Sequence, residues 1–179
     1  MPDFFKRPIV RIPVRYGLIA GLFGFSLMLV LYYMDRHPFL VPLFFDFRIL
    51  LFSILLVFCL KEIRDFHQNG VLHFFQAMFA GFTFTLVFAF LCSLLLYVYM
   101  QWNPEFVSSF ITLATAQAKT ISQADMEQMG KGVYEELMAS LQNTSGLYLA
   151  RRFFFQSFIL SFFLSLIISV ILRSQPKSQ

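Results

Sequence analysis

Four apolar stretches, each close to the length of chain that crosses a bilayer, constrain this sequence more than any other feature. They run from Tyr16 to Met34, from Val41 to Leu60, from Phe74 to Met100 and from Phe153 to Leu172. The mean hydropathy of +0.69 is also outside the range of soluble domains. Inside hydrocarbon every backbone amide must be bonded within the protein, which a helix achieves alone. The sequence therefore predicts an all-α integral membrane protein, a four-helix transmembrane bundle.

The remaining segments divide the chain around these spans. Residues 1–15 form a basic arm, 16–100 the first three spans, 101–152 a two-helix insertion, 153–172 the fourth span and 173–179 a tail. Prolines at positions 2, 8 and 13 predict that the arm is extended along the lipid surface. Besides marking topology, the arm could bind acidic lipids or a partner. The sequence after Met34 does not resemble a cleavage site, so the first span is expected to be retained.

Basic residues set the expected orientation. If both termini are cytoplasmic, the inner segments hold eight Lys and Arg residues and the outer segments hold six. The basic residues before the first span usually dominate the choice. We therefore expect a multi-pass protein of the bacterial inner (cytoplasmic) membrane with both termini in the cytoplasm, although Arg151 and Arg152 beside the fourth span count against this orientation.

The insertion is expected to be an extracytoplasmic helical hairpin. Asn103-Pro104-Glu105 has a capping side chain, a proline for the first helical position and an acid for the positive end of the helix dipole. Ser122 and Asp125 resemble a capping box for a second helix, which Gly130 and Gly132 weaken. The apolar face of this hairpin, between Glu105 and Leu141, needs a cover: the membrane interface, the outer ends of the bundle, a partner protein, or a lipid or small apolar ligand.

Small residues identify the expected contacts between spans, because they let helix backbones approach closely. The first span has Gly17 and Gly21. The third and fourth spans carry small residues at every fourth position, which are Ala77, Gly81, Thr85, Ala89 and Ser93, then Ser157, Ser161, Ser165 and Ser169. The serine line could instead form a polar track for a substrate or ion. No Asp, Glu, Lys, Arg or His lies in either span, which argues against such a track.

Charged groups near the outer ends of the second and fourth spans are the expected exceptions. Asp46 and Arg48 lie inside the second stretch, and Arg151 and Arg152 precede the fourth. A charge at this depth is costly unless it is paired or reaches the interface. We expect Asp46 to pair with Arg151 or Arg152 as a structural tie, with a binding or gating site as the alternative.

No residue pattern predicts a catalytic site, a cofactor or a metal. Cys59 and Cys92 fall inside spans, where a thiol usually behaves as a small apolar group. The three histidines show no ligand spacing, and the hairpin methionines, which could suit Cu(I), have no Cys or His beside them. The basic residues flank the spans rather than cluster, so no nucleic-acid partner is expected.

Several motifs resemble one known family. They are Tyr16-Gly17-Leu18-Ile19-Ala20-Gly21, Ile63-Arg64-Asp65, Asn69-Gly70, Phe74 with Ala77 and Gly81, Tyr97 with Tyr99, and Asn103-Pro104-Glu105-Phe106. Together they resemble the bacterial membrane proteins grouped as domain of unknown function 4199, common in Bacteroidetes. Val71-Leu72-His73 departs from the more polar approach to the third span in that family. The resemblance implies a four-span inner-membrane protein and no particular activity.

Three functions follow as hypotheses. The first is a non-enzymatic accessory or scaffold subunit of an envelope complex, with the 105–141 hairpin as the surface for a membrane-protein partner. The second is a lipid-handling or small-solute permease component, which needs a cavity between the third and fourth spans. The third is a membrane enzyme using Asp46, Arg48 or the Arg64-Asp65 pair, and no neighbouring base and nucleophile supports it.

Overall fold

The protein is all-α. A computed structural model describes residues 7–41, 47–120 and 130–173, without the side chains of Phe47, Arg48 and Lys131. In these residues six α-helices and one π-helical turn follow in the order α2 (Pro8–Tyr33), α3 (Phe47–Glu62), η2 (Ile63–His67), α4 (Phe74–Trp102), α5 (Pro104–Lys119), α7 (Lys131–Gln142) and α8 (Gly146–Leu172).

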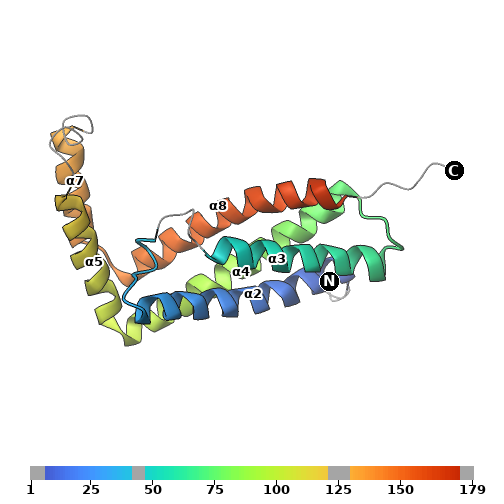
Figure 1. The fold of residues 1–179 in the computed structure, drawn as a ribbon, viewed down its shortest axis with the longest axis horizontal. Helices are drawn as coiled ribbons and strands as arrows, with labels where there is room; N and C mark the ends of the chain where they lie inside the picture. The colour runs from blue at the N-terminus through green and yellow to red at the C-terminus, as the bar shows by residue number, and fades with distance from the viewer. Residues whose placement is uncertain (1–6, 42–46, 121–129, 174–179) are drawn as a thin grey trace.

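The helices form a long bundle with a short hairpin across one end (Figure 1). Helices α2, α3, α4 and α8 lie side by side, and α4 makes the most extensive contacts, with α2 and with α8. Helices α5 and α7 lie nearly at right angles to the bundle. We call the end that carries α5 the hairpin end, and the opposite end, where α2 begins, the basic end.

Three of the helices are long and apolar enough to cross a membrane. These candidate spans are α2, α4 and α8. Helix α3 has 16 residues and begins at Phe47 rather than Val41, and at 1.5 Å per residue it is about 24 Å long. The hydrocarbon core is about 30 Å thick. The described part of the second predicted span is therefore shorter than the hydrocarbon core, and residues 42–46 lie outside the described part of the chain.

The expectation of an extended arm is wrong from Pro8 onward. Pro8 occupies the first turn of α2, where the missing amide hydrogen has no partner to lose. Pro13 lies inside the helix, which continues through it. Val10, Ile12 and Pro13 are buried against the bundle, and this burial offsets the hydrogen bond that Pro13 lacks.

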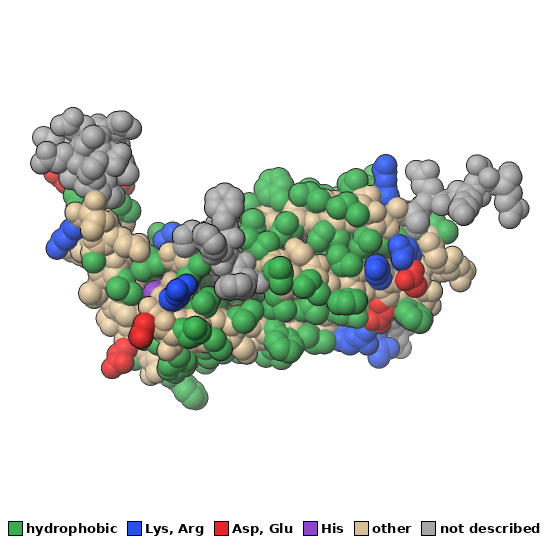
Figure 2. All heavy atoms as spheres, in the orientation of Figure 1, with side chains coloured by type: hydrophobic (Ala, Val, Ile, Leu, Met, Phe, Trp, Pro, Cys, Tyr) green, Lys and Arg blue, Asp and Glu red, His purple; other side chains and the backbone are tan. Residues whose placement is uncertain are grey.

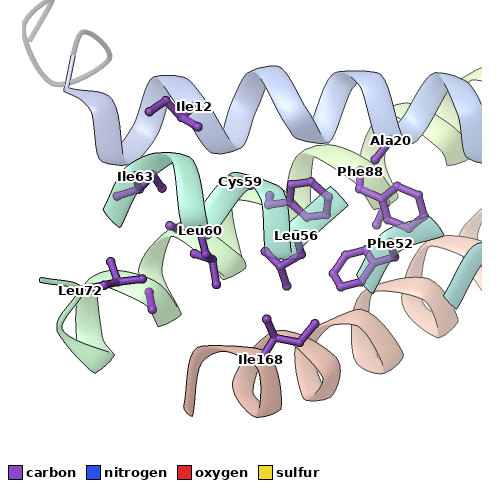
Figure 3. Close-up of a cluster of buried hydrophobic side chains, with 14 residues drawn as sticks. Ile12, Ala20, Phe52, Leu56, Cys59, Leu60, Ile63, Leu72, Phe88 and Ile168 are labelled. Carbon is purple, nitrogen blue, oxygen red and sulfur yellow. The ribbon is translucent and has the colours of Figure 1, made fainter. Parts of the chain in front are cut away.

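Two apolar clusters fill the bundle. The one toward the basic end joins α2, α3, η2, α4 and α8, and Figure 3 shows Phe52, Leu56 and Leu60 of α3 pointing among side chains of the other helices. The second lies toward the hairpin end, around Met28 of α2, Leu96 of α4 and Phe153 of α8. Its members Phe106 and Phe110 come from α5, so this cluster attaches the hairpin to the bundle.

A sharp turn separates the second predicted stretch from the third. Asn69 and Gly70 both have positive φ, at 50° and 79°, as their sequence indicated. The Gly70 amide donates to the Arg64 carbonyl at 2.9 Å and closes the π-helical turn. Helix α4 can therefore begin only four residues later, beside the end of η2.

Charged side chains gather at the two ends of the bundle. On the face shown in Figure 2, the middle of the bundle is mostly apolar, and Lys, Arg, Asp and Glu lie near the ends. At the basic end they include Arg15, Lys61, Glu62, Arg64 and Asp65. This distribution is the one expected for helices whose middle portions face hydrocarbon.

Candidate functional site

Glycines of α2 bring this helix against α4. A Cβ atom added to Gly17 would lie 2.9 Å from the Val87 Cβ and 3.0 Å from the Phe84 carbonyl oxygen. One added to Gly21 would lie 3.0 Å from the Leu91 side chain. Real Cβ atoms do not make contacts this short at a backbone oxygen, so the two helices can approach to this distance only where the side chain is absent.

The small residues of α4 and α8 meet in a second close contact. A Cβ added to Gly81 would lie 3.0 Å from the Ser165 Cβ and 3.8 Å from the Ser169 Oγ. Other members of the two predicted lines have different surroundings. Ala77, Thr85, Ala89 and Ser161 are buried, while Ser93 and Ser157 are half-buried. At Gly81 the helices are packed too closely for a path between them.

Two hydroxyl groups in the buried lines have no hydrogen-bond partner. Ser165 donates its Oγ hydrogen to the Phe162 carbonyl at 2.8 Å. Among the described residues, Thr85 Oγ1 and Ser169 Oγ are fully buried and make no such bond. Unpaired buried hydroxyls usually destabilise a protein, because desolvation is not compensated.

An ion pair at the basic end joins α2 to α3. Nη2 of Arg15 donates to both carboxylate oxygens of Glu62 at 2.7 Å, and the Tyr16 hydroxyl donates to Oε2 at 2.8 Å. The Arg15 guanidinium also lies 5.3 Å from the centre of the Tyr16 ring. The pairing of Arg15 with Glu62 was not predicted from the sequence. The feature that could have indicated it is the opposite charge of these residues at facing ends of consecutive antiparallel helices.

A second ion pair lies on η2. Arg64 Nε donates to Asp65 Oδ1 at 2.6 Å. The Arg64 guanidinium lowers the pKa of the Asp65 carboxyl group. The two residues are adjacent in sequence, and both side chains are at least partly exposed. The arrangement stabilises the turn and supplies no catalytic geometry.

Aromatic rings join the hairpin to the bundle around His37. This residue lies in the link between α2 and α3 and is 5% exposed. The centre of its ring lies 4.7 Å from the ring of Phe106 and 5.4 Å from that of Phe110. Tyr32 and Phe39 complete the surroundings of the imidazole. The end of α2, the link that follows it and the distant helix α5 therefore meet at one histidine.

Both nitrogens of His37 face a backbone partner. Nε2 lies 3.1 Å from the Phe106 carbonyl oxygen, and the Phe39 amide donates to Nδ1 at 3.4 Å. A neutral ring with its hydrogen on Nε2 satisfies both contacts, whereas a protonated ring would turn a hydrogen toward the Phe39 amide. Burial lowers the pKa of His37, partly opposed by the Phe106 carbonyl. This histidine is therefore suited to be a neutral structural link.

Helix α5 begins as the sequence indicated, but its cap differs. Pro104 occupies the first turn, and Glu105 follows it there. The Asn103 side chain makes no capping bond; its backbone amide instead donates to the Tyr99 carbonyl at 2.9 Å and continues from α4. The cap of α8 was not predicted from the sequence. Ser145 Oγ accepts from the Tyr148 amide, and α8 begins at Gly146, seven residues before Phe153.

Helix α7 packs mainly against α5 rather than against the bundle. It begins at Lys131, after Gly130 with a φ of 88°. Val133 and Leu137, one turn apart on α7, are 53% and 37% exposed. On α5 the apolar side chain of Leu113 is also exposed. Helix α7 thus presents apolar side chains to its surroundings, and Leu113 of α5 borders hollows beside the link around His37.

Some predicted contacts cannot be placed. Asp46, Ser122, Asp125 and the side chain of Arg48 lie outside the described residues, and so do Met126 and Met129. Arg151 and Arg152 are exposed on the first turns of α8. Within the described residues, no three His, Cys, Asp or Glu side chains gather as metal ligands, and Cys59 and Cys92 are buried and form no disulfide.

Comparison with known proteins places the chain in a family. A family model described as a protein of unknown function, DUF4199, matches residues 15–174. The chain belongs to the DUF4199 family. The resemblance drawn from the sequence motifs is thereby confirmed. No curated protein and no solved structure matches this DUF4199 chain.

Proposed function

We propose that this DUF4199 protein is a four-span, non-enzymatic accessory or scaffold subunit of an envelope complex in the bacterial inner membrane. The observation that carries the proposal is the α5–α7 hairpin, which extends from the bundle with α7 packed mainly against α5 and with apolar side chains exposed. Such a surface on a rigid support is suited to bind another membrane protein.

The direction of the helices supports α3 as a span in addition to α2, α4 and α8. Gly17 faces Val87, Gly24 faces Cys92, and the Tyr33 and Tyr99 hydroxyls are 3.2 Å apart. Residue numbers rise together along this contact, so α2 and α4 are parallel. The chain must return to the basic end between them, and α3 with η2 is the helical segment that does so.

The charges support cytoplasmic termini. The basic end carries Arg11 and Arg15 before the apolar part of α2, Lys61 in the last turn of α3, Arg64 in η2, and Arg173 after α8. Placing this end in the cytoplasm agrees with the preference of Lys and Arg for that side. The α5–α7 hairpin is then extracytoplasmic, where it is accessible to a partner in the envelope.

The alternative, a lipid-handling or small-solute permease component, has weaker support. It requires a cavity between α4 and α8. These helices are in close contact at Gly81 and Ser165, and the space between them near the hairpin end is a groove on the side of the bundle rather than a path through it. An enzymatic role has the least support, because the charged groups of the Arg15–Glu62 and Arg64–Asp65 pairs bind each other.

Site-specific crosslinking tests the scaffold role. A photoreactive amino acid at Val133 or Leu137 of the full chain, in native membranes, should yield a covalent adduct with one discrete membrane protein. Ile159 is the matched control, since its side chain is 55% exposed on the part of α8 that would face lipid. Recovery of the protein's own helices alone from both hairpin positions would contradict the proposal.

A further inference from the structure

A groove between α4 and α8 opens on the side of the bundle near the hairpin end. It has a volume of about 460 Å³. From α4 it is lined by Phe90, Ser93, Leu94 and Tyr97, and from α8 by Leu147, Ala150, Arg151, Phe154 and Phe155. Ala150 is buried and Ser93 half-buried, so small side chains form the floor. Exposed phenylalanine and leucine side chains form the walls.

The walls of this groove face hydrocarbon in a membrane. Phe90 and Phe155 are 59% and 55% exposed, and they lie on helices that are candidate spans. A bilayer would fill a groove of this kind with acyl chain, because an unfilled space would lose the van der Waals contacts of the side chains that line it. Hydrocarbon alone would not select one lipid over another.

The charge at the end of the groove supplies selectivity. The uncharged run of α8 begins at Phe153 and has 20 residues, which span about 30 Å, the thickness of the hydrocarbon core. Arg151 therefore lies at the level of the lipid headgroups. Tyr99 and Trp102 lie at the end of α4, and such aromatic side chains favour the same level.

Arg151 is available to a ligand. Within the described residues its guanidinium makes no ion pair and no hydrogen bond, unlike Arg15, which binds Glu62. A guanidinium binds a phosphate through paired hydrogen bonds. An apolar groove at hydrocarbon depth, ending in a cation that pairs with none of the described residues, complements a phospholipid with one anionic headgroup.

We infer that this groove holds one anionic phospholipid, with an acyl chain between α4 and α8 and the headgroup phosphate on Arg151. This site is distinct from the partner surface on α7 and requires only that the bundle spans the bilayer. The bound lipid would cover the small residues at the floor of the groove and support the junction where α8 meets the hairpin.

Native mass spectrometry of the purified full chain in detergent tests the site. We expect one phosphatidylglycerol per chain to bind in preference to phosphatidylcholine. Arg151→Gln should raise the dissociation constant of phosphatidylglycerol about tenfold, the effect of losing a charge-assisted hydrogen bond. Arg152→Gln is the matched control, because the neighbouring arginine does not line the groove, and it should change the constant less than about twofold.

Two further variants keep the test independent of folding. Ala150→Phe should fill the floor and abolish the adduct. If that variant does not fold, Ser93→Phe at the half-buried opposite side should do the same. Equal affinity for both lipids, or equal losses in Arg151→Gln and Arg152→Gln, would overturn the inference. So would a photoreactive group at Phe155 that captures a protein in native membranes instead of lipid, whatever the result at Leu137.

Discussion

At the residue scale, the unpaired hydroxyl of Thr85 is a buried cost that the fold tolerates. Thr85→Val replaces the hydroxyl with a methyl group of similar size, so we expect the free energy of unfolding to stay equal or rise by about 1 kcal/mol. Thr83 is the control, because its Oγ1 donates to the Phe79 carbonyl at 2.9 Å. Thermal unfolding in detergent measures both variants. A larger loss in Thr85→Val than in Thr83→Val would show that the Thr85 hydroxyl has a partner.

His37 makes the junction of the hairpin sensitive to acid. Because burial lowers the pKa of His37 in the folded protein, the unfolded chain binds a proton more readily. The stability contributed by neutral His37 is thus present above pH of about 6.5 and is lost as pH falls through the lower folded value. We expect the midpoint temperature of thermal unfolding to be lower at pH 5.5 than at pH 7.5.

The control for this pH dependence is His37→Gln, which cannot titrate. Asp35 and Arg36 border a hollow on one side of His37, and Glu105 borders another, so these charges are common to both proteins. The wild type should lose more stability on acidification than the variant does. Parallel losses in both proteins would assign the effect to other groups.

Single residues also show the limit of prediction from sequence. The spacing of Gly17 and Gly21 indicates close approach of a neighbour but does not name it; the structure places α4 there. The Arg15–Glu62 pair depends on how the ends of α2 and α3 align, which local patterns do not specify. His37 was assigned no metal from its spacing, and its junction role depends on rings of α5 that lie far away in sequence.

At the element scale, turns, prolines and capping side chains decide where the helices begin. Apolar length predicted α4 closely, because Phe74 to Met100 is one uninterrupted run between a turn and a proline. The prediction for α2 began too late, since prolines at positions 8 and 13 predict an extended segment. Pro8 lies in the first turn, which tolerates proline, and the helix continues through Pro13. The prediction for α8 also began too late, because Arg151 and Arg152 interrupt the apolar stretch, whereas the helix continues through them from its cap at Ser145.

The packing of α2 on α4 gives a prediction for glycine substitution. Gly17→Val places a branched side chain within 3.0 Å of the Phe84 carbonyl, a backbone atom that cannot rotate away. We expect a loss of about 1–3 kcal/mol in the free energy of unfolding, typical of overpacking. Gly132→Ala in α7 is the control, since a Cβ there meets nothing within 4 Å. Denaturation in detergent compares the two, and equal stability would place α2 farther from α4.

At the scale of the whole molecule, the bundle and the hairpin have different constraints. The bundle excludes water through glycine and serine contacts on both sides of α4. The hairpin is held at its base by Phe106 and Phe110, while α7 depends mainly on α5. A partner bound to α7 would therefore be positioned by the junction around His37. This coupling of a rigid membrane support to an exposed helix pair favours a scaffold over a transport path.

The crossing of α3 gives the prediction that decides topology. The native thiols of Cys59 and Cys92 are buried, so an introduced cysteine can be labelled selectively. Arg36 and Lys61 are both exposed; Arg36 precedes α3 in the sequence, and Lys61 lies in its last turn. With four spans and cytoplasmic termini, Arg36→Cys should react with a membrane-impermeant maleimide in intact cells, as should Ser108→Cys on α5. Lys61→Cys should react only after the cells are permeabilised. Labelling of Arg36→Cys and Lys61→Cys from the same side would mean that α3 does not cross, and the reverse pattern would invert the orientation.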